Sequence, residues 1–249
     1  MVTRPSFADA VAAVANVDGW MTEGQARRLW DRAAALEPGC RMVEIGSFRG
    51  RSTTILALAA VDGVELVAID PHAGNDRGPQ QIEGFAEEAA VDHDVFHANL
   101  ERAGVSTRVR HARQFSQDAL GAVDGDVQLL YIDGAHRYTP ALADIRVWGA
   151  RVAPGGTLLI HDSFSCVGVT LAILRSLAFG FRFRYVGRVG SLSEYRCELV
   201  ARRARVRNAL RQLAELPWFA RNVVIKVLIV ARLGRLTRLL GHRTDDWPY

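Results

Sequence analysis

The sequence predicts an α/β fold, a doubly wound, mainly parallel, seven-stranded sheet with helices on both faces. Short apolar runs alternate with helical patterns between residues 41 and 178, an order typical of parallel strands joined by helices. Several of these runs are apolar throughout, as expected for strands that are covered on both faces. Two further apolar runs before residue 200 are expected to close the sheet.

The first elements are predicted to form an N-terminal helical cap over residues 1–40. FADAVAAVANV is an Ala/Val-rich amphipathic stretch. Thr22 and Gln25 have the spacing of a capping box, which indicates that a second helix begins there. Pro38 and Gly39 are expected to end that helix.

The sheet is predicted to occupy residues 41–200. Strands are expected over residues 41–45, 65–69, 108–112, 127–132, 157–160, 181–186 and 195–200. Helices are expected over residues 52–60, 84–103, 116–120, 140–151 and 167–178. In such a sheet, ligands bind beyond the carboxyl ends of the strands, so the residues that follow each strand are the candidates for a functional site.

Composition indicates a globular protein of ordinary type. Its 249 residues suit one large domain, or one domain with a small appendage, and the hydrophobic and charged fractions of 49% and 23% are unexceptional. Three widely separated cysteines favour a reducing cytoplasm. We find neither a secretory signal nor an apolar run long enough to span a membrane. Abundant alanine, with Lys226 as the only lysine among many arginines, suggests a high-GC genome such as that of an actinobacterium.

Residues 201–249 are expected to form a basic amphipathic helical tail. They carry eleven basic and three acidic side chains, a net charge of +8, whereas residues 1–200 carry −4. Over residues 217–243, one helical face would hold Ile229, Leu233, Leu236 and Leu240, and another would hold Arg232, Arg235, Arg238 and His242. Such a helix can rest on anionic lipid at the inner membrane surface, dock on its own domain, or contact a second subunit. No nucleic-acid partner is expected, because no basic platform interleaved with aromatic residues is present.

The segment VEIGSFRGRS, residues 43–52, runs from a predicted strand into a predicted helix. Gly46 and Gly50 permit a tight turn that a ligand can approach, and Glu44 lies near the strand end. Asp70 ends the next strand about 20 residues on, where an acidic group commonly binds a ribose diol. The glycine spacing differs from GxGxxG, and a carboxylate at this place disfavours NAD and ATP. A simple strand–helix turn with an incidental acid is the alternative.

A second group of polar residues follows two later strands. Asp133 and His136 lie in YIDGAHRY, and His161 and Asp162 lie in LLIHDSF. Two carboxylates brought together repel each other unless a cation compensates them, which points to Mg²⁺ or Mn²⁺. His161 is either a third ligand or a neighbour of the cofactor, and His136 suits a general base. Helix capping by the two aspartates and a structural role for His136 are the alternatives.

Five ordered motifs, from GWMT through VEIGSFRGRST, VAIDPH and LLYIDGAHRY to APGGTLLIHD, resemble class I S-adenosylmethionine-dependent methyltransferases. The resemblance is to the subgroup labelled methyltransferase family 24 or cephalosporin-hydroxylase-like. It implies a Rossmann-like fold, with Glu44, Gly46 and Gly50 facing the methionine part of the cofactor, and the segment 114–116 near its adenine. We therefore expect cofactor contacts from Glu44, Gly46, Ser47, Gly50, Ser52, Thr53, Asp70, His72, Gln114, Ser116 and Asp133.

The second group resembles the site of metal-dependent sugar O-methyltransferases, although His161-Asp162 stands where that pattern has Glu-Asp. The resemblance implies metal ligands Asp133, His161 and Asp162, with His136 as the base that deprotonates an acceptor hydroxyl. Arg137 and Tyr138 would line the acceptor site. The subgroup also resembles mycobacterial enzymes, and that resemblance implies a sugar acceptor, such as a mannoside of methylmannose polysaccharide, or a glycolipid.

Three other functions remain open on the sequence. The first is a metal-independent methyltransferase that acts on a small molecule or on nitrogen. The second is a non-catalytic peripheral membrane or scaffold protein that keeps the fold. The third, an iron oxygenase using His136, His161 and Asp162, is disfavoured by the intact cofactor turn. Residues 72–99 are a candidate lid over the acceptor, and the spacing in DHDVFH, residues 92–97, favours a solvated helical face over a second metal site.

Overall fold

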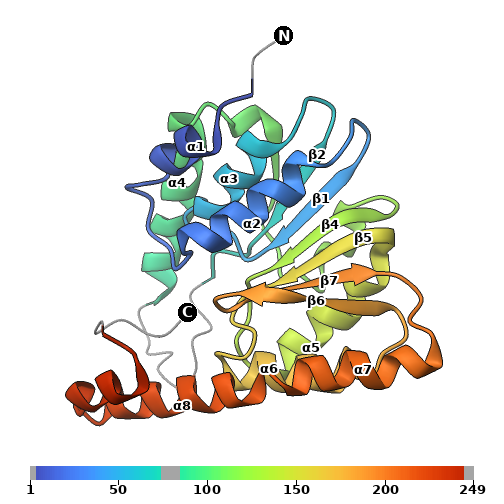
Figure 1. The fold of residues 1–249 in the computed structure, drawn as a ribbon. Coiled ribbons are helices and arrows are strands. Elements are labelled where there is room, and N and C mark those ends of the chain that lie inside the picture. Colours follow the sequence, from blue (N-terminus) through green and yellow to red (C-terminus); the bar gives the residue numbers. More distant parts are fainter. Residues whose placement is uncertain (1–3, 74–84, 244–249) are drawn as a thin grey trace.

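The computed structural model describes residues 4–73 and 85–243, with side chains given outside residues 85–90. Its centre is a seven-stranded sheet of order β3-β2-β1-β4-β5-β7-β6 (Figure 1). The strands are β1 (Arg41–Ile45), β2 (Glu65–Ile69), β3 (Val109–Ala112), β4 (Val127–Ile132), β5 (Val152–Ile160), β6 (Phe183–Val189) and β7 (Leu192–Cys197). β7 pairs antiparallel with β5 and β6, and the pairings among β1 to β5 are parallel. The predicted fold class is confirmed.

Helices cover both faces of the sheet (Figure 1). The first face carries α1 (Phe7–Ala13), α2 (Glu23–Ala34), α3 (Arg51–Ala59) and α4 (Phe85–Arg102), and the second carries α5 (Tyr138–Val147), α6 (Val167–Ser176) and part of the tail. On β2, Leu66 and Ala68 enter the first core while Val67 and Ile69 enter the second. Side chains alternate across a strand, so both faces must be apolar, and this explains the unbroken apolar runs.

The N-terminal helices are tied to the antiparallel edge of the sheet. The predicted capping box is present at the start of α2, where Thr22 accepts from the Gln25 amide and Gln25 accepts from that of Thr22. The Gln25 side chain also donates to Ser191 Oγ at 3.0 Å. Arg28 and Arg32 both pair with Glu194, which is buried on β7. Two cations therefore neutralise one buried carboxylate between α2 and the sheet.

The predicted single helix over residues 217–243 is wrong. The tail forms α7 (Arg202–Leu213), α8 (Leu216–Val230) and a 3₁₀ segment, η4 (Gly234–Leu240). Arg232 has a φ of 60°, and the Leu233 amide donates to the Leu228 carbonyl, so the helix closes there. Elsewhere β5 starts at Val152, five residues before the predicted strand. The helix expected over 116–120 is a 3₁₀ turn, η2 (Ala119–Ala122), and two more such turns are η1 (Ser106–Arg108) and η3 (Gly149–Arg151).

One face of α8 docks on the second helical layer. Ile225 is fully buried, and the Asn222 side chain donates to the Phe164 carbonyl at 3.4 Å. The opposite face leaves Val224 and Val227 exposed. The structure thus agrees with docking on the chain's own domain, and a lipid or subunit partner for the outer face stays a prediction. Among the residues described, no helix combines the length and the apolar character needed to cross a membrane.

Candidate active site

A cleft of about 960 Å³ lies at the carboxyl ends of β1, β2, β4 and β5. Its volume is in the range of ligand sites for small molecules and cofactors. Among the described residues, every strand end that forms it contributes side chains named in the sequence analysis. The predicted residues that line it are Gly46, Ser47, Ser52, Asp70, His72, Ser116, Asp133, His136, Arg137, His161 and Asp162.

Gly46 is required because two strand ends meet there. Its φ is +86°, and a Cβ on this residue would lie 2.3 Å from the Asp133 carbonyl oxygen and 2.7 Å from Gly134 Cα. No side chain fits at that distance. The glycine was expected to let a ligand approach, and the structure shows that the backbone after β4 occupies the space.

Asp70 holds the turn between β1 and α3. One carboxylate oxygen accepts from the Ser47 and Phe48 amides at 2.8 and 2.9 Å, and the other accepts from the His72 amide at 2.8 Å. A carboxylate that accepts several backbone hydrogen bonds fixes the geometry of the loops that donate them. Asp70 therefore organises the turn in addition to lining the cleft.

Glu44 lies behind the turn and does not line the cleft. It is fully buried, and Thr53 Oγ1 donates to its carboxylate. Burial raises the pKa of Glu44 to about 8, against the hydrogen bonds from Ser52 and Thr53, so the group is neutral at pH 7. The expected direct contact of this carboxylate with the cofactor does not match its place in the structure.

Three other predicted cofactor residues also lie outside the cleft lining: Gly50, Thr53 and Gln114. Gly50 has a φ of +85° and begins α3, where a Cβ would come within 3.2 Å of Phe96. Gln117 lines the cleft in place of Gln114. Ser116 lines it as expected and donates to Asp144, whose pKa is raised to about 6 by burial.

Several cleft residues were missed. Trp20 and Phe48 line the cleft with their rings 5.5 Å apart, and Phe115 and Lys226 also line it. Trp20 belongs to GWMT, which the resemblance named without assigning it a contact. Lys226 comes from the tail, and Lys226 Nζ donates to the Ser165 carbonyl at 2.9 Å. No local sequence pattern indicates that a helix so late in the chain contributes a side chain to the cleft.

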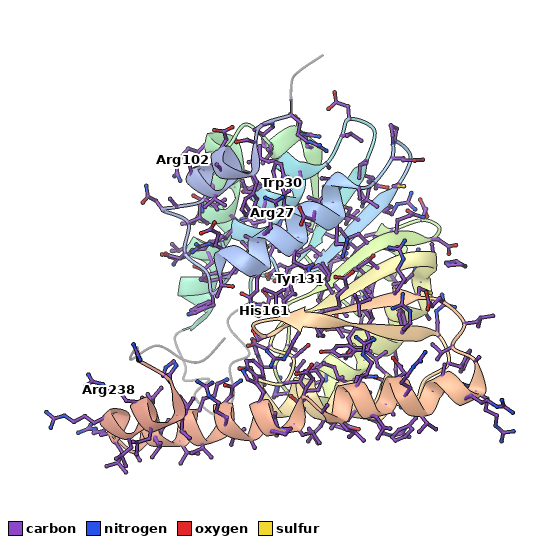
Figure 2. The ribbon with its side chains drawn as sticks, viewed as in Figure 1. Arg27, Trp30, Arg102, Tyr131, His161 and Arg238 are labelled. Carbon is purple, nitrogen blue, oxygen red and sulfur yellow. The ribbon has the colours of Figure 1, made fainter. Side chains whose placement is uncertain are left out.

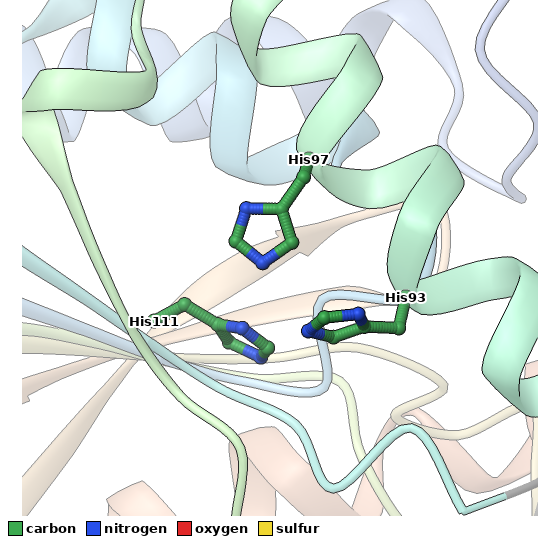
Figure 3. Close-up of side chains that lie close together, drawn as sticks. All are labelled: His93, His97 and His111. Atoms are coloured by element: carbon green, nitrogen blue, oxygen red, sulfur yellow. The ribbon is translucent and has the colours of Figure 1, made fainter.

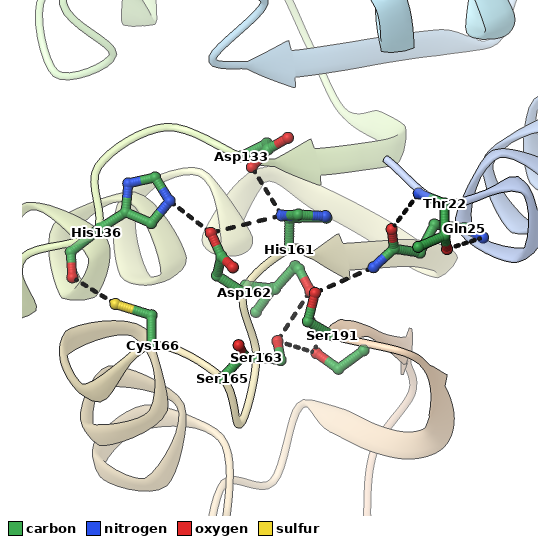
Figure 4. A network of polar contacts seen from close by, with 12 residues as sticks. Thr22, Gln25, Asp133, His136, His161, Asp162, Ser163, Ser165, Cys166 and Ser191 are labelled. Atoms are coloured by element: carbon green, nitrogen blue, oxygen red, sulfur yellow. Dashed lines mark hydrogen bonds and ion pairs between the residues drawn. The ribbon is translucent and has the colours of Figure 1, made fainter. Parts of the chain in front are cut away.

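The titratable group after β4 and β5 is brought together as predicted (Figure 4). His136 Nε2 forms a hydrogen bond with Asp162 Oδ2. His161 Nδ1 lies 3.1 Å from Asp133 Oδ1 and 3.6 Å from Asp162 Oδ2, and is therefore between the two carboxylates. The Tyr131 hydroxyl donates to Asp133 Oδ2 at 2.7 Å, which orients that carboxylate.

The two aspartates favour the protonated form of His161. Burial by itself lowers the pKa of His161, but Asp133 and Asp162 outweigh that effect and raise it well above the ordinary value. Burial likewise opposes ionisation of Asp162, and His161 and His136 hold the pKa of that carboxyl well below its usual range. Two aspartates were expected to need a metal ion, and an imidazolium at His161 already compensates part of their charge.

The donor set that could hold a metal differs from the expected one. Among the described residues near the cleft, Asp133, His136 and Asp162 each offer a ligand atom, all within 4.8 Å of one another. His136 stands in this set in the place where the sequence predicted His161. Two carboxylates and an imidazole suit a divalent cation such as Mn²⁺ or Mg²⁺.

Backbone strain is concentrated at this cleft. Of the five described non-glycine residues with positive φ, Phe48, His72 and Asp162 line the cleft, and Phe164 lies two residues after Asp162. Phe164 is bulky and fully buried at a φ of 55°. Such conformations cost about 1–3 kcal/mol each and persist where the surroundings enforce them, which is common at functional sites. Here they turn the chain sharply after β1, β2 and β5.

The acceptor side is described in part. Arg137 lines the cleft, whereas Tyr138, at the first position of α5, does not line it and is 39% exposed. Tyr138 was expected to line the acceptor site, but the structure places it outside the cleft. Residues 74–84 of the candidate lid lie outside the described residues, so that prediction is untested.

Comparison with known proteins fits this geometry. Residues 43–163 match the family described as Methyltransferase domain. A curated relative of the chain is "Uncharacterized protein y4gI" of Sinorhizobium fredii, 28% identical over 165 residues. The alignment covers 65% of this chain and only 16% of that protein.

Solved structures share the fold of this chain. They include cofactor-bound Rv0187 from MTB, with 21% identity, TM-score 0.55 and coverage of 77% of this chain and 89% of that one. An O-methyltransferase from Bacillus cereus in complex with SAH has 18% identity, TM-score 0.54 and coverage of 78% and 93%. TomG from Streptomyces achromogenes, an O-methyltransferase in complex with SAM, has 20% identity, TM-score 0.52 and coverage of 80% and 92%. At these identities the likeness establishes the fold.

Proposed function

We propose that the protein transfers a methyl group from S-adenosylmethionine to a hydroxyl of an acceptor, most specifically of a sugar or glycolipid. The observation that carries this proposal is the His136–Asp162 pair on the cleft wall, opposite the turn held by Asp70. The cofactor assignment is supported by the match to the methyltransferase domain and by the cofactor-bound structures of the same fold.

In the proposed reaction, His136 accepts the proton of the acceptor hydroxyl. The hydroxyl oxygen attacks the sulfonium methyl carbon, a C–O bond forms, and the methyl–sulfur bond breaks with its electron pair on sulfur. S-adenosylhomocysteine and the methyl ether are the products, and the proton passes from His136 to solvent. Asp162 orients the imidazole and stabilises its protonated form, the role of the carboxylate in an Asp–His pair.

The cofactor is proposed to lie along the turn 46–48, with its ribose near Asp70 and its adenine near Ser116 and Phe115. Asp70 already accepts three backbone amides, which pre-forms the site before the cofactor arrives. Trp20 and Phe48 add an aromatic wall, suited to the apolar carbons of the cofactor or the acceptor. Glu44 supports the turn from behind through Thr53.

A divalent cation fits Asp133, His136 and Asp162, and when bound it would supply Lewis acidity toward an acceptor hydroxyl. His136 would then be a ligand of the cation, so its role as the base belongs to the metal-independent reaction. The protonated His161 between the carboxylates favours the second candidate, a metal-independent methyltransferase. The two candidates differ in one measurement. Turnover that survives EDTA supports the metal-independent enzyme, and turnover restored only by Mg²⁺ or Mn²⁺ supports the metal-assisted one.

The test is S-adenosylhomocysteine formation from S-adenosylmethionine with a panel of hydroxylated acceptors, including mannosides and glycolipids, with and without Mg²⁺. We expect turnover with at least one acceptor, and its loss in His136→Ala. His242→Ala, a histidine change in the tail far along the chain, is the matched control. Absence of turnover with every acceptor, together with no S-adenosylmethionine binding by calorimetry, would instead support a non-catalytic protein that retains the fold.

A further inference from the structure

A cluster of three histidines lies outside the cleft, between α4 and β3 (Figure 3). His93 and His97 are four residues apart on α4, so they share one helical face, and His111 faces them from β3. One ring nitrogen from each lies within 4.8 Å of the others. The ring centroids are 4.7 to 5.4 Å apart.

We propose that His93, His97 and His111 form a binding site for a transition-metal ion, Zn²⁺ in the first instance. The inference goes beyond the proposed methyl transfer and does not depend on it. Two ligands from adjacent turns of a helix and one from a neighbouring strand provide three imidazoles, a number found in zinc sites that keep one position for water. A tetrahedral zinc ion separates its nitrogen ligands by about 3.3 Å, which small rotations of the three side chains would achieve.

The other ring nitrogens support this assignment. His111 Nε2 lies 3.2 Å from the Asp70 carbonyl, and His93 Nδ1 lies 3.3 Å from Asp94 Oδ1. Metal-binding histidines usually donate their second nitrogen to a carbonyl or carboxylate, which fixes the ring and its tautomer. If both nitrogens donate in this way, the remaining nitrogen of each ring carries a lone pair for a metal.

The chemistry of the cluster selects the kind of ion. It contains imidazoles alone, which suit Zn²⁺ and its first-row neighbours, whereas Mg²⁺ prefers oxygen ligands. His97 is partly exposed, so an ion and a completing water can enter from solvent. Burial and the neighbouring histidines lower the pKa of His111 to about 4 and also lower that of His97. Both rings are therefore neutral at pH 7, as metal binding requires.

The position of the cluster gives the ion a consequence for the cleft. Asp70 accepts from His111 through its carbonyl and holds the cofactor turn through its carboxylate. On α4, Asp92 pairs with Arg49 Nε at 2.7 Å, and Asn99 donates to the Arg49 carbonyl at 2.8 Å. An ion that joins α4 to β3 would therefore brace the same turn from behind. Without an ion, the rings would serve only as packing around Phe96, which lies 4.8 Å from the His111 ring.

The experiment is a Zn²⁺ titration of the full chain after EDTA treatment, in competition with a chromophoric chelator at pH 7.5. His97→Ala is the primary variant because the side chain is partly exposed, and His93→Gln is the second. Loss of a ligand should weaken Zn²⁺ binding by about 100-fold or more, since even the loss of a residue that only hydrogen-bonds to a ligand costs about 10- to 100-fold. Zn²⁺ should also raise the Tm of the wild type and leave that of His97→Ala unchanged.

Two controls separate this site from others. His242→Ala should bind Zn²⁺ like the wild type. Asp162→Asn alters the donor set in the cleft. This variant should still bind the one equivalent of Zn²⁺ that depends on the three histidines. The proposal is overturned if His97→Ala and His93→Gln bind Zn²⁺ as tightly as the wild type. It is also overturned if Asp162→Asn loses all of the Zn²⁺ that the wild type binds.

Discussion

The two walls of the cleft are built on different physical principles. The wall that we propose to bind the cofactor, residues 46–48 with Asp70 (the cofactor wall), is made of backbone amides gathered around one carboxylate. The acid–base wall, formed by Asp133, His136, His161 and Asp162, is made of coupled titratable side chains (Figure 4). Backbone dipoles keep their strength at any pH, whereas the second wall depends on where its protons lie. Binding and reactivity are therefore expected to fail separately.

The largest expected effect is on the acid–base wall. His136→Ala should lower kcat by about 100- to 10,000-fold, the usual contribution of a positioned general base. The Kd for S-adenosylmethionine should stay near that of the wild type, because the cofactor wall is untouched. Steady-state kinetics and calorimetry measure the two quantities. A matching loss in both would show that the walls are not independent.

Substitution of Glu44 tests the buried carboxyl group that supports the cofactor wall from behind. Its pKa is raised to about 8 in the folded protein against 4.5 for an ordinary glutamate. The folded state keeps a proton that the unfolded state has lost, so stability should fall as pH rises from about 4.5 to about 8. Glu44→Gln should remove a loss on the order of 2–4 kcal/mol between pH 5 and pH 8. Urea unfolding across this range measures it.

The matched control for Glu44→Gln is Glu65→Gln at the start of β2. Arg110 and Arg41 lower the pKa of Glu65 against the opposing effect of burial. A glutamate with a lowered pKa is ionised in both the folded and unfolded states above pH 5, so this variant should keep the wild-type slope between pH 5 and pH 8. Equal slopes in all three proteins would contradict the buried neutral state of Glu44.

Gly46 is the point at which the two walls touch. Gly46→Ala places a Cβ against the backbone of Asp133, which cannot move without separating β1 from β4. We expect a loss of about 1–3 kcal/mol in unfolding free energy, the cost of an overpacked site, and weaker binding together with slower turnover. Gly39→Ala, at a glycine of similar φ with open space around it, is the control that isolates the strain of the positive φ. If both variants lose the same stability, the contact contributes nothing.

The smallest expected effect is on cofactor affinity alone. Asp70→Asn keeps the size of the side chain but replaces one acceptor oxygen, so one of its amide contacts to the turn is lost. We expect S-adenosylmethionine binding to weaken about 10- to 100-fold, the range for hydrogen bonds to a charged group, with little change in kcat at saturation. Asp62→Asn, whose side chain is 87% exposed, should bind normally. A fall in kcat larger than the change in Kd would place Asp70 in the chemical step.

The strand ends were predictable because each is a local signal. An apolar run ends, and the next residues are glycine, acid or histidine, as at Gly46, Asp70, Asp133 and His161. Parallel strands place these residues at one edge of the sheet whatever the details of packing. That rule brought the turn, Asp70 and the acid–base wall together correctly.

The depth at which each side chain lies, and the contacts between segments far apart in the chain, were not predictable in this way. Nothing local distinguishes Glu44, which points behind the turn, from Ser47, which lines the cleft, since both belong to one short segment. The positions of His136 and His161 relative to the Asp162 carboxylate depend on a strained turn at residues 162–164. The three-histidine cluster joins a helix to a strand 14 residues further along, and DHDVFH alone suggested only a solvated face.

The sequence by itself determined the α/β class, a doubly wound and mainly parallel sheet, and the residues that meet at its carboxyl edge. These follow from periodicity and turn chemistry, which act over a few residues. Only the tertiary structure decided that Lys226 of the tail reaches the cleft, that a charged His161 lies between the two aspartates, and that three histidines converge behind Asp70. Those facts depend on distances between segments far apart in the chain, which packing alone sets.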